Sequence, residues 1–227
     1  MKQDLKNIQE SYLSIYYEQD SILIPRRSAE ERQKNHINAT LKKIQDYIKN
    51  GSKGDLDLSE TPIISLPDNL KVIGGNLDLH YTSITALPNG LKIGGTLNLS
   101  STLIKVLPDG LSVGGNLNLS NAPIKALPNG LKIGGGNLDL SDTPITTLPN
   151  GLKISGTLDL YRAPITVLPD GLSVGGYLNL YKTLIKTLPN NLKVIGDLNL
   201  FDTPLAKKYT REQIKQMYPG VKGSIYL

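Results

Sequence analysis

The chain has 227 residues, carries 25 Lys and Arg against 20 Asp and Glu, and has a net charge of +5. It contains no cysteine, which excludes disulfides, thiolate metal ligands and cysteine nucleophiles. Its first residues mix charged with apolar side chains and no run approaches the roughly 20 apolar residues of a membrane span, so we expect a soluble, cytoplasmic protein with no membrane partner.

Residues 1–50 are charged, lack glycine and have the apolar spacing of helices. The stripe of the first expected helix is Leu5, Ile8, Tyr12, Ile15 and Tyr16. The stripe of the second is Ile37, Leu41, Ile44 and Ile48. A capping box predicts that the second helix begins at Ser28, with Glu31 three residues later, and Gly51 ends it. We expect an N-terminal α-helical hairpin cap over the adjoining segment; an independent effector or dimerisation segment is the alternative.

Residues 51–205 repeat a Leu-x-Leu pair in about eight coils of 20–21 residues. The pairs begin at Leu56, Leu77, Leu97, Leu117, Leu138, Leu158, Leu178 and Leu198. Each pair reads as a short strand whose leucines point inward and whose middle residue points outward. An Ile and the Leu before Pro, such as Ile84 and Leu87, add to about six inward aliphatic side chains per coil. Such self-similarity predicts an α+β repeat solenoid built on a parallel β-sheet.

Two glycine columns recur with the same period. The first comes two residues after each Pro and comprises Gly90, Gly110, Gly130, Gly151 and Gly171, with Asn69 and Asn191 in the same slot. Because Gly and Asn tolerate positive φ, a left-handed residue is expected there in every coil. The second column precedes each strand, where the backbone is expected to bend, and comprises Gly75, Gly95, Gly115, Gly135, Gly156, Gly176 and Gly196.

The pattern Leu-x-Leu-x-x-Thr-x-Ile-x-x-Leu-Pro resembles the leucine-rich repeat in its short bacterial Leu-Pro form over roughly residues 54–205. The Gly-Gly and Thr variant is more similar to arrays encoded by bacteriophages. Related secreted bacterial effectors also place a helical segment before the repeats. The resemblance implies a curved solenoid that binds protein partners on its concave sheet face.

One departure from that family concerns its usual Asn. The residues in its place are Thr61, Thr82, Thr102, Ala122, Thr143, Ala163, Thr183 and Thr203. A ladder of hydroxyl groups could satisfy buried backbone groups, but the two alanines could not. A β-helix is therefore the alternative fold.

Residues 206–227 are expected to form a C-terminal cap of a helix and a strand. A capping signature at Thr210–Gln213 begins a short helix that stops at Pro219-Gly220. Residues 221–227 repeat the residue pattern that leads into the strand of each coil, which predicts a ninth strand.

Two outward columns are candidates for partner contact. The first, between the paired leucines, reads Asp57, Asp78, Asn98, Asn118, Asp139, Asp159, Asn179 and Asn199, and its simplest role is solubility and bonding across coils. The second changes from Ser59, His80, Ser100, Ser120 and Ser141 to Tyr161, Tyr181 and Phe201. Exposed aromatics near arginine are typical of protein interfaces; the alternative is that the C-terminal helix covers these rings or that they only stack on one another. The predicted partner-binding residues are Tyr161, Arg162, Tyr177, Asn179, Tyr181, Lys182, Asn199, Phe201 and Tyr226, the last projecting beside Phe201.

Other functions have weaker support. A lysine column after the turn (Lys71, Lys92, Lys132, Lys153, Lys193) could meet phosphates, but it reads as a solvated face and makes nucleic acid an unlikely partner. His36 and His80 have no triad or metal-ligand spacing around them, so we expect no enzyme, no metal and no cofactor.

We therefore expect a monomeric, non-enzymatic module that binds a protein partner through its sheet face. A phage or bacterial effector acting on a host protein, in the host cytoplasm, is the leading form of this hypothesis. The alternatives are a structural component of a phage particle or assembly, and a nucleic-acid binder that uses the lysine columns.

Overall fold

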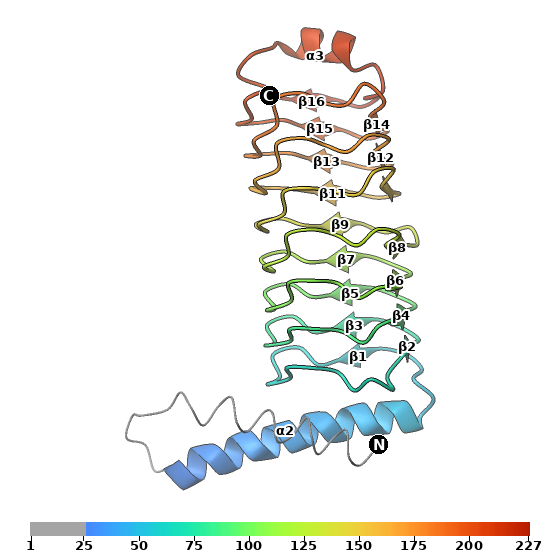
Figure 1. The fold of residues 1–227 in the computed structure, drawn as a ribbon, viewed down its shortest axis with the longest axis vertical. Helices are drawn as coiled ribbons and strands as arrows, with labels where there is room; N and C mark the ends of the chain where they lie inside the picture. Colours follow the sequence, from blue (N-terminus) through green and yellow to red (C-terminus); the bar gives the residue numbers. More distant parts are fainter. Residues whose placement is uncertain (1–25) are drawn as a thin grey trace.

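The computed structural model of the chain describes residues 26–227, with side chains from residue 31 onward. One long helix lies across one end of a stack of coils, and a short helix lies across the other end (Figure 1). The first helix expected from the sequence, with Leu5 to Tyr16, lies outside the described residues.

The long helix, α2, spans Arg26–Lys49 and begins two residues before the expected start. Helical backbone therefore continues through Ser28, which is not the N-cap that the capping box predicted; such boxes locate a helix start only to within about two residues. Gly51 ends the helix as expected, at φ 76°. Its amide donates to the carbonyl of Ile48, and that of Ser52 donates to Tyr47, both at 3.0 Å, in the pattern of a Schellman motif.

The coils form one continuous parallel sheet of nine strands. Its strands, in order, are β1 (Leu56–Asp57), β3 (Leu77–Asp78), β5 (Leu97–Asn98), β7 (Leu117–Asn118), β9 (Leu138–Asp139), β11 (Leu158–Asp159), β13 (Leu178–Asn179), β15 (Leu198–Asn199) and β16 (Ile225–Tyr226). Each strand pairs with the equivalent residues of the next coil, as Leu97 pairs with Leu117. We number the coils one to nine by these strands. The ninth strand was predicted from the C-terminal residues and is confirmed.

A second set of strands runs along the side of the stack, labelled at the right in Figure 1. One group is β2 (Val72–Ile73), β4 (Lys92–Ile93), β6 (Ser112–Val113) and β8 (Lys132–Ile133), and the other is β10 (Lys153–Ile154), β12 (Ser173–Val174) and β14 (Lys193–Val194). The two groups are separate sheets, because β8 and β10 do not pair. The break coincides with the extra residue of the fourth coil, at Gly134–Gly136.

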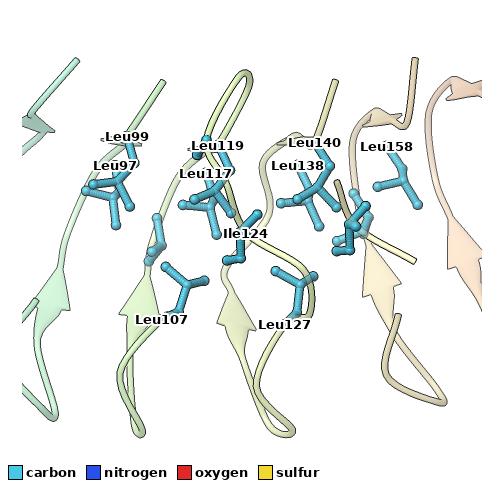
Figure 2. Close-up of a cluster of buried hydrophobic side chains, with 14 of the residues drawn as sticks. Leu97, Leu99, Leu107, Leu117, Leu119, Ile124, Leu127, Leu138, Leu140 and Leu158 are labelled. Carbon is cyan, nitrogen blue, oxygen red and sulfur yellow. The ribbon is translucent and has the colours of Figure 1, made fainter. Parts of the chain in front are cut away.

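The core is a set of aliphatic columns, one column per inward position. In the third coil it comprises Leu97, Leu99, Ile104, Leu107, Leu111 and Val113, all at most 2% exposed. Figure 2 shows Leu97, Leu117 and Leu138 succeeding one another from coil to coil. The predicted six inward aliphatics are therefore confirmed. Since each coil covers the next, burial of apolar surface at about 25 cal/mol per Å² is the main stabilising term.

The two ends of this core are covered by helices. On one side Ile37, Leu41 and Ile44 of α2 join the core, and so does Tyr47, which the sequence pattern did not reveal. The Tyr47 hydroxyl lies 2.9 Å from the carbonyl oxygens of both Ser52 and Gly54, which share its one donated proton. On the other side α3 (Arg211–Met217) begins with the predicted capping box of Thr210 and Gln213 and buries Ile214.

The first glycine column has the predicted left-handed backbone, with φ between 69° and 76° from Gly90 to Gly171. The prediction was wrong for Asn69 and Asn191, which do not have positive φ. In both turns the amide of the next residue still donates to the proline carbonyl, as Leu70 does to Pro67 at 2.9 Å. A type I turn keeps this bond with a negative φ, so these two turns need no left-handed residue.

The second glycine column exists for close approach between coils and not for bending. A Cβ on Gly196 would lie 2.6 Å from the carbonyl carbon of Gly176, and one on Gly176 would lie 2.8 Å from that of Gly156. Before the fifth strand this slot belongs to Gly136, whose Cβ would lie 2.6 Å from the Gly115 carbonyl carbon. Gly135, which the sequence pattern placed here, is the extra residue, and its Cβ would contact nothing within 4 Å.

The Thr column makes local bonds and not the expected ladder between coils. Each hydroxyl donates to the carbonyl three residues earlier, as Thr183 does to Leu180 at 2.7 Å. In the two coils with Ala the backbone amide serves this carbonyl, as Ala163 does for Leu160 at 2.9 Å. Because this carbonyl has a hydrogen-bond donor in every coil, the position can be occupied by either Ala or Thr.

Candidate partner-binding face

Side chains between the paired leucines first hold the backbone of their own coil. In all eight coils with the Asp/Asn column, the Oδ1 atom accepts the amide of the residue two positions later, as Asp159 accepts that of Tyr161 at 2.8 Å. Three of these side chains also bond across coils. Asn199 donates to Asn179 at 3.2 Å, and Asn179 donates to Asp159 at 3.0 Å. The bonding role considered for this column is therefore present at Asn179 and Asn199.

Beside this column the three C-terminal aromatic side chains form a continuous stack, which we call the aromatic ridge (Tyr161, Tyr181 and Phe201). The ring centroids of Tyr161 and Tyr181 are 5.3 Å apart, and those of Tyr181 and Phe201 are 5.4 Å apart with an interplanar angle of 79°. These are favourable tilted and edge-to-face geometries. Phe201 is 52% exposed, so α3 does not cover the end of the ridge.

Two cations lie on the ridge because of an unusual backbone conformation. The residue after each ridge position has positive φ, 57° at Arg162 and 60° at Lys182. This turn brings the Arg162 guanidinium carbon to 5.0 Å from the Tyr161 ring centroid and the Lys182 ammonium to 5.0 Å from that of Tyr181. Cations over aromatic faces at this distance are attracted by the ring quadrupole. Arg162 also pairs with Asp142 at 3.5 Å.

Tyr226 does not lie beside Phe201, and that prediction was wrong. It pairs in register with Asn199, so it occupies the Asp/Asn position and not the ridge position two residues later. Its hydroxyl donates to Oδ2 of Asp197 at 3.2 Å. Burial raises the pKa of Tyr177, while hydrogen bonding to the Asn199 side chain opposes that rise. Tyr177, Asn199 and Tyr226 thus form a group of their own on the same sheet face, beside the ridge and not part of it.

The column before each strand has a role that the sequence pattern did not reveal. Its Asx side chains accept the first amide of the next coil, as Asn76 does for Thr96, Asn116 for Asn137 and Asp197 for Ser224, each at 2.7 Å. The recurrence of Asn and Asp directly before Leu-x-Leu is the signal that could have revealed it. This column and the Asp/Asn column together border a hollow on the sheet face in coils two to five.

We call this hollow, of about 490 Å³, the polar hollow. It is lined by Asn76, Leu77, Asp78, Thr96, Asn98, Asn116, Leu117, Asn118, Asn137 and Asp139. Eight of these ten residues have amide, hydroxyl or carboxylate side chains, and Leu77 and Leu117 add apolar surface. The aromatic ridge lies in coils six to eight, so the sheet face has a polar half and an aromatic half.

The lysine column lies on the side sheets and is interrupted. Ser112 pairs between Lys92 and Lys132, and Ser173 pairs between Lys153 and Lys193. Lys71 is not a member of the column, because the extra residue of the first coil places Val72 opposite Lys92. Within each side sheet the lysines are thus two coils, about 10 Å, apart, which is about one Debye length in physiological salt.

Groups for other chemistry are few in the described part of the chain. Among residues 26–227 no three His, Cys, Asp or Glu side chains are grouped as a metal site would need. No helix in that range is long and apolar enough to span a bilayer. Nδ1 of His80 donates to Oδ1 of Asp78 at 2.7 Å, and Nε2 lies 3.7 Å from Glu60, an arrangement that holds a proton but offers no nucleophile.

No family model and no curated protein matches the sequence. Among solved structures, the leucine-rich-repeat domain of a Shigella effector is similar, with a TM-score of 0.54 and 18% identity. The alignment covers 91% of this chain and 98% of that one. A likeness over nearly the full length of both chains favours the repeat solenoid over the β-helix.

Proposed function

We propose, from the premise that this chain folds as a leucine-rich-repeat solenoid, that it is a non-enzymatic module whose sheet face binds a protein partner. The observation that carries the proposal is the aromatic ridge. A ridge of three stacked rings with a cation on two of them has the composition of an interface hot spot.

The ridge is suited to binding because it is already ordered. Each ring packs against its neighbour, and the backbone before each ring is held by an Asp or Asn side chain. Binding a partner therefore costs the ridge less side-chain entropy than it would cost a surface whose side chains are free to move. Arg162 and Lys182 add donors that could meet carboxylates or carbonyls at the rim.

The kind of partner is proposed by analogy with the Shigella effector domain. We propose an effector of a bacterium or phage that acts on a host protein in the host cytoplasm, as a monomer before it binds. Tyr177, Asn179, Asn199 and Tyr226 border the same sheet face and are proposed as secondary contacts. The aromatic half is proposed as the primary contact because its three rings are continuous and Phe201 at their end is 52% exposed.

The test uses the purified full chain as bait in host lysate, with bound proteins quantified by mass spectrometry. The triple variant Tyr161→Ala, Tyr181→Ala, Phe201→Ala should weaken capture of a specific partner by about 30-fold or more, the effect of losing a hot spot. The matched control is Tyr81→Ala, which removes a 67% exposed tyrosine outside the ridge. Equal capture by the triple variant and the wild type would show that the ridge is not the binding surface. Light scattering during gel filtration distinguishes a monomeric binder from a self-assembling structural component.

A further inference from the structure

The polar hollow differs from the rest of the sheet face because the side-chain amide nitrogens of its asparagines are not hydrogen-bonded within the described chain. In coils seven and eight the amide nitrogens of Asn179 and Asn199 are both used in bonds between coils. In the hollow the side-chain oxygens of the asparagines accept backbone amides, but their Nδ2 groups have no partner within residues 26–227. These asparagines are Asn76, Asn98, Asn116, Asn118 and Asn137. The hollow therefore offers a grid of donors to an occupant.

Carboxylates stand at the two ends of this grid. Asp78 lies in the second coil and Asp139 in the fifth, with Asn98 and Asn118 between them in register. Oδ1 of Asp78 is used by His80, and Oδ1 of Asp139 is used by Ser141. Within the described chain Oδ2 of each has no bonded partner. Each end of the hollow thus offers one acidic oxygen.

The charged groups around the hollow are mainly carboxylates although the chain as a whole is +5. The outward columns of coils one to five contain no Lys or Arg, and their carboxylates belong to Asp55, Asp57, Glu60, Asp78, Asp139 and Asp142. Basic groups lie at the margins of these columns: Lys43 of α2 acts electrostatically on Asp57, Arg162 pairs with Asp142, and His80 bonds to Asp78. A basic occupant would therefore meet no Lys or Arg inside the hollow.

The spacing of the two end carboxylates selects a particular kind of basic occupant. Three steps between coils of about 4.8 Å place Asp78 and Asp139 about 14 Å apart. An extended polypeptide advances about 3.4 Å per residue, so residues i and i+4 are also about 14 Å apart and point to the same side. Carbonyl groups of the segment between them would lie over the amide donors.

We infer that the polar hollow binds an extended basic segment of a partner protein, with Lys or Arg at positions i and i+4 over Asp139 and Asp78 and its carbonyls on the asparagine amides. The inference deepens the proposed function, since it rests on the sheet face being a protein-binding surface. On this inference, coils two to five contact a different part of the partner from the part that the aromatic ridge contacts.

The test measures peptide binding to the full chain by fluorescence anisotropy. The probe is a labelled Lys-Thr-Ser-Thr-Lys peptide with blocked ends, and its isomers carry the two lysines at i, i+2 or i, i+3. The i, i+4 peptide should bind about tenfold more tightly than either isomer, and its affinity should fall as salt is raised.

The variant for this test is Asp78→Asn with Asp139→Asn. Asn occupies the same column in four other coils, so the bond from Oδ1 to the backbone is retained and the fold is expected to persist, which thermal melting checks. The matched control is Asp109→Asn with Asp170→Asn, which removes the same charge at exposed turns. Peptide affinity should fall about tenfold in the first pair and stay within about twofold in the second.

Three results would overturn the inference. They are no measurable peptide binding by the wild type, equal affinity for the three spacings, and equal affinity in the two variant pairs. Dimerisation in sedimentation that is lost in Asp78→Asn with Asp139→Asn would also overturn it, since the occupant would then be a second copy. The aromatic-ridge triple variant should bind the peptide normally, so that failure of the ridge and failure of the hollow are told apart.

Discussion

The side-chain amide of Asn179 donates a hydrogen bond to Oδ1 of Asp159 on the neighbouring coil, at 3.0 Å. The same oxygen accepts the backbone amide of Tyr161 at 2.8 Å. These two donors do not offset the cost of burying the charge. Burial raises the pKa of the Asp159 carboxyl above its ordinary value, and the nearby carboxylates of Asp139 and Asp142 raise it further.

Asp159→Asn should therefore stabilise the fold at neutral pH. A carboxyl group whose pKa is raised on folding binds its proton more tightly in the folded state, so its charge lowers the free energy of unfolding as pH rises through the unfolded and then the folded pKa. Asn at this position keeps the Oδ1 acceptor. The melting temperature of the variant should exceed that of the wild type at pH 7, and the difference should disappear below about pH 3.5. Asp170→Asn, at an exposed turn, is the control; a difference that persists at low pH would contradict this electrostatic reason.

Removing one buried hydroxyl of the Thr column should have a small, defined cost. The Thr183 hydroxyl donates to the Leu180 carbonyl at 2.7 Å, and the Thr183 amide also donates to it at 3.0 Å. Thr183→Ala leaves the carbonyl with the amide alone, as in the coil of Ala163, and should lower the free energy of unfolding by about 1 kcal/mol. Urea denaturation measures the change. The exposed Thr187→Ala should cost less than about 0.5 kcal/mol, and a similar loss in both variants would show that the hydroxyl bond contributes nothing specific.

The core was predictable from the sequence because each aliphatic position has one environment in every coil. Leu97 and Leu99 alternate with an outward Asn98, and this period alone places them inside. The positions of Tyr226 and Gly135 were not predictable in this way. They depend on where an extra or missing residue falls within a coil, and the period does not reveal that. The donors of the polar hollow were not predictable either, because they are the side-chain amides that remain unbonded after the coils stack. The amide of Asn118 remains unbonded, whereas that of Asn179 does not.

The stability of the fold should depend on pH through His80, because the folded state favours its protonated imidazole. Its hydrogen bond with Asp78 raises the pKa of the imidazole above its ordinary value of 6.5, and Glu60 and Asp57 add to the rise. Because the pKa of His80 is higher in the folded state than in the unfolded state, its full contribution to stability is present at pH values below the pKa of the unfolded state. The contribution is lost as pH rises through the pKa of the folded state.

His80→Ser tests this dependence, since serine occupies the position in four of the other coils. The wild type should exceed the variant in free energy of unfolding at pH 5, and the difference should shrink as pH rises above about 6.5. Adding Asp78→Asn to both proteins should remove most of the pH dependence of that difference. If the difference between the proteins is the same at pH 5 and pH 9, the ion pair has no role in stability.

Removing one of the three consecutive glycines Gly134–Gly136 should join the two side sheets and stabilise the solenoid. The extra residue comes after β8, so β8 and β10 do not pair, and the side chains of Leu131 and Ile133 are only partly buried. Their counterparts Leu111 and Val113 are at most 2% exposed. A coil of about 20 residues would restore the register of its neighbours and allow the amides of Lys153 and Ser155 to bond to β8. The free energy of unfolding should rise by about 1–2 kcal/mol from these bonds and the added burial.

Hydrogen exchange provides the local measurement for this deletion. In the wild type the amides of Lys153 and Ser155 should exchange faster than those of Ser173 and Gly175, which donate to the preceding coil at 3.0 and 2.8 Å. In the deletion variant the four amides should be protected alike. The matched control inserts one glycine between Gly94 and Gly95, which should separate β4 from β6 and expose the amides of Ser112 and Gly114 to exchange. A deletion that lowers stability, or leaves Lys153 unprotected, would show that the break at β8 is held by contacts other than the length of the coil.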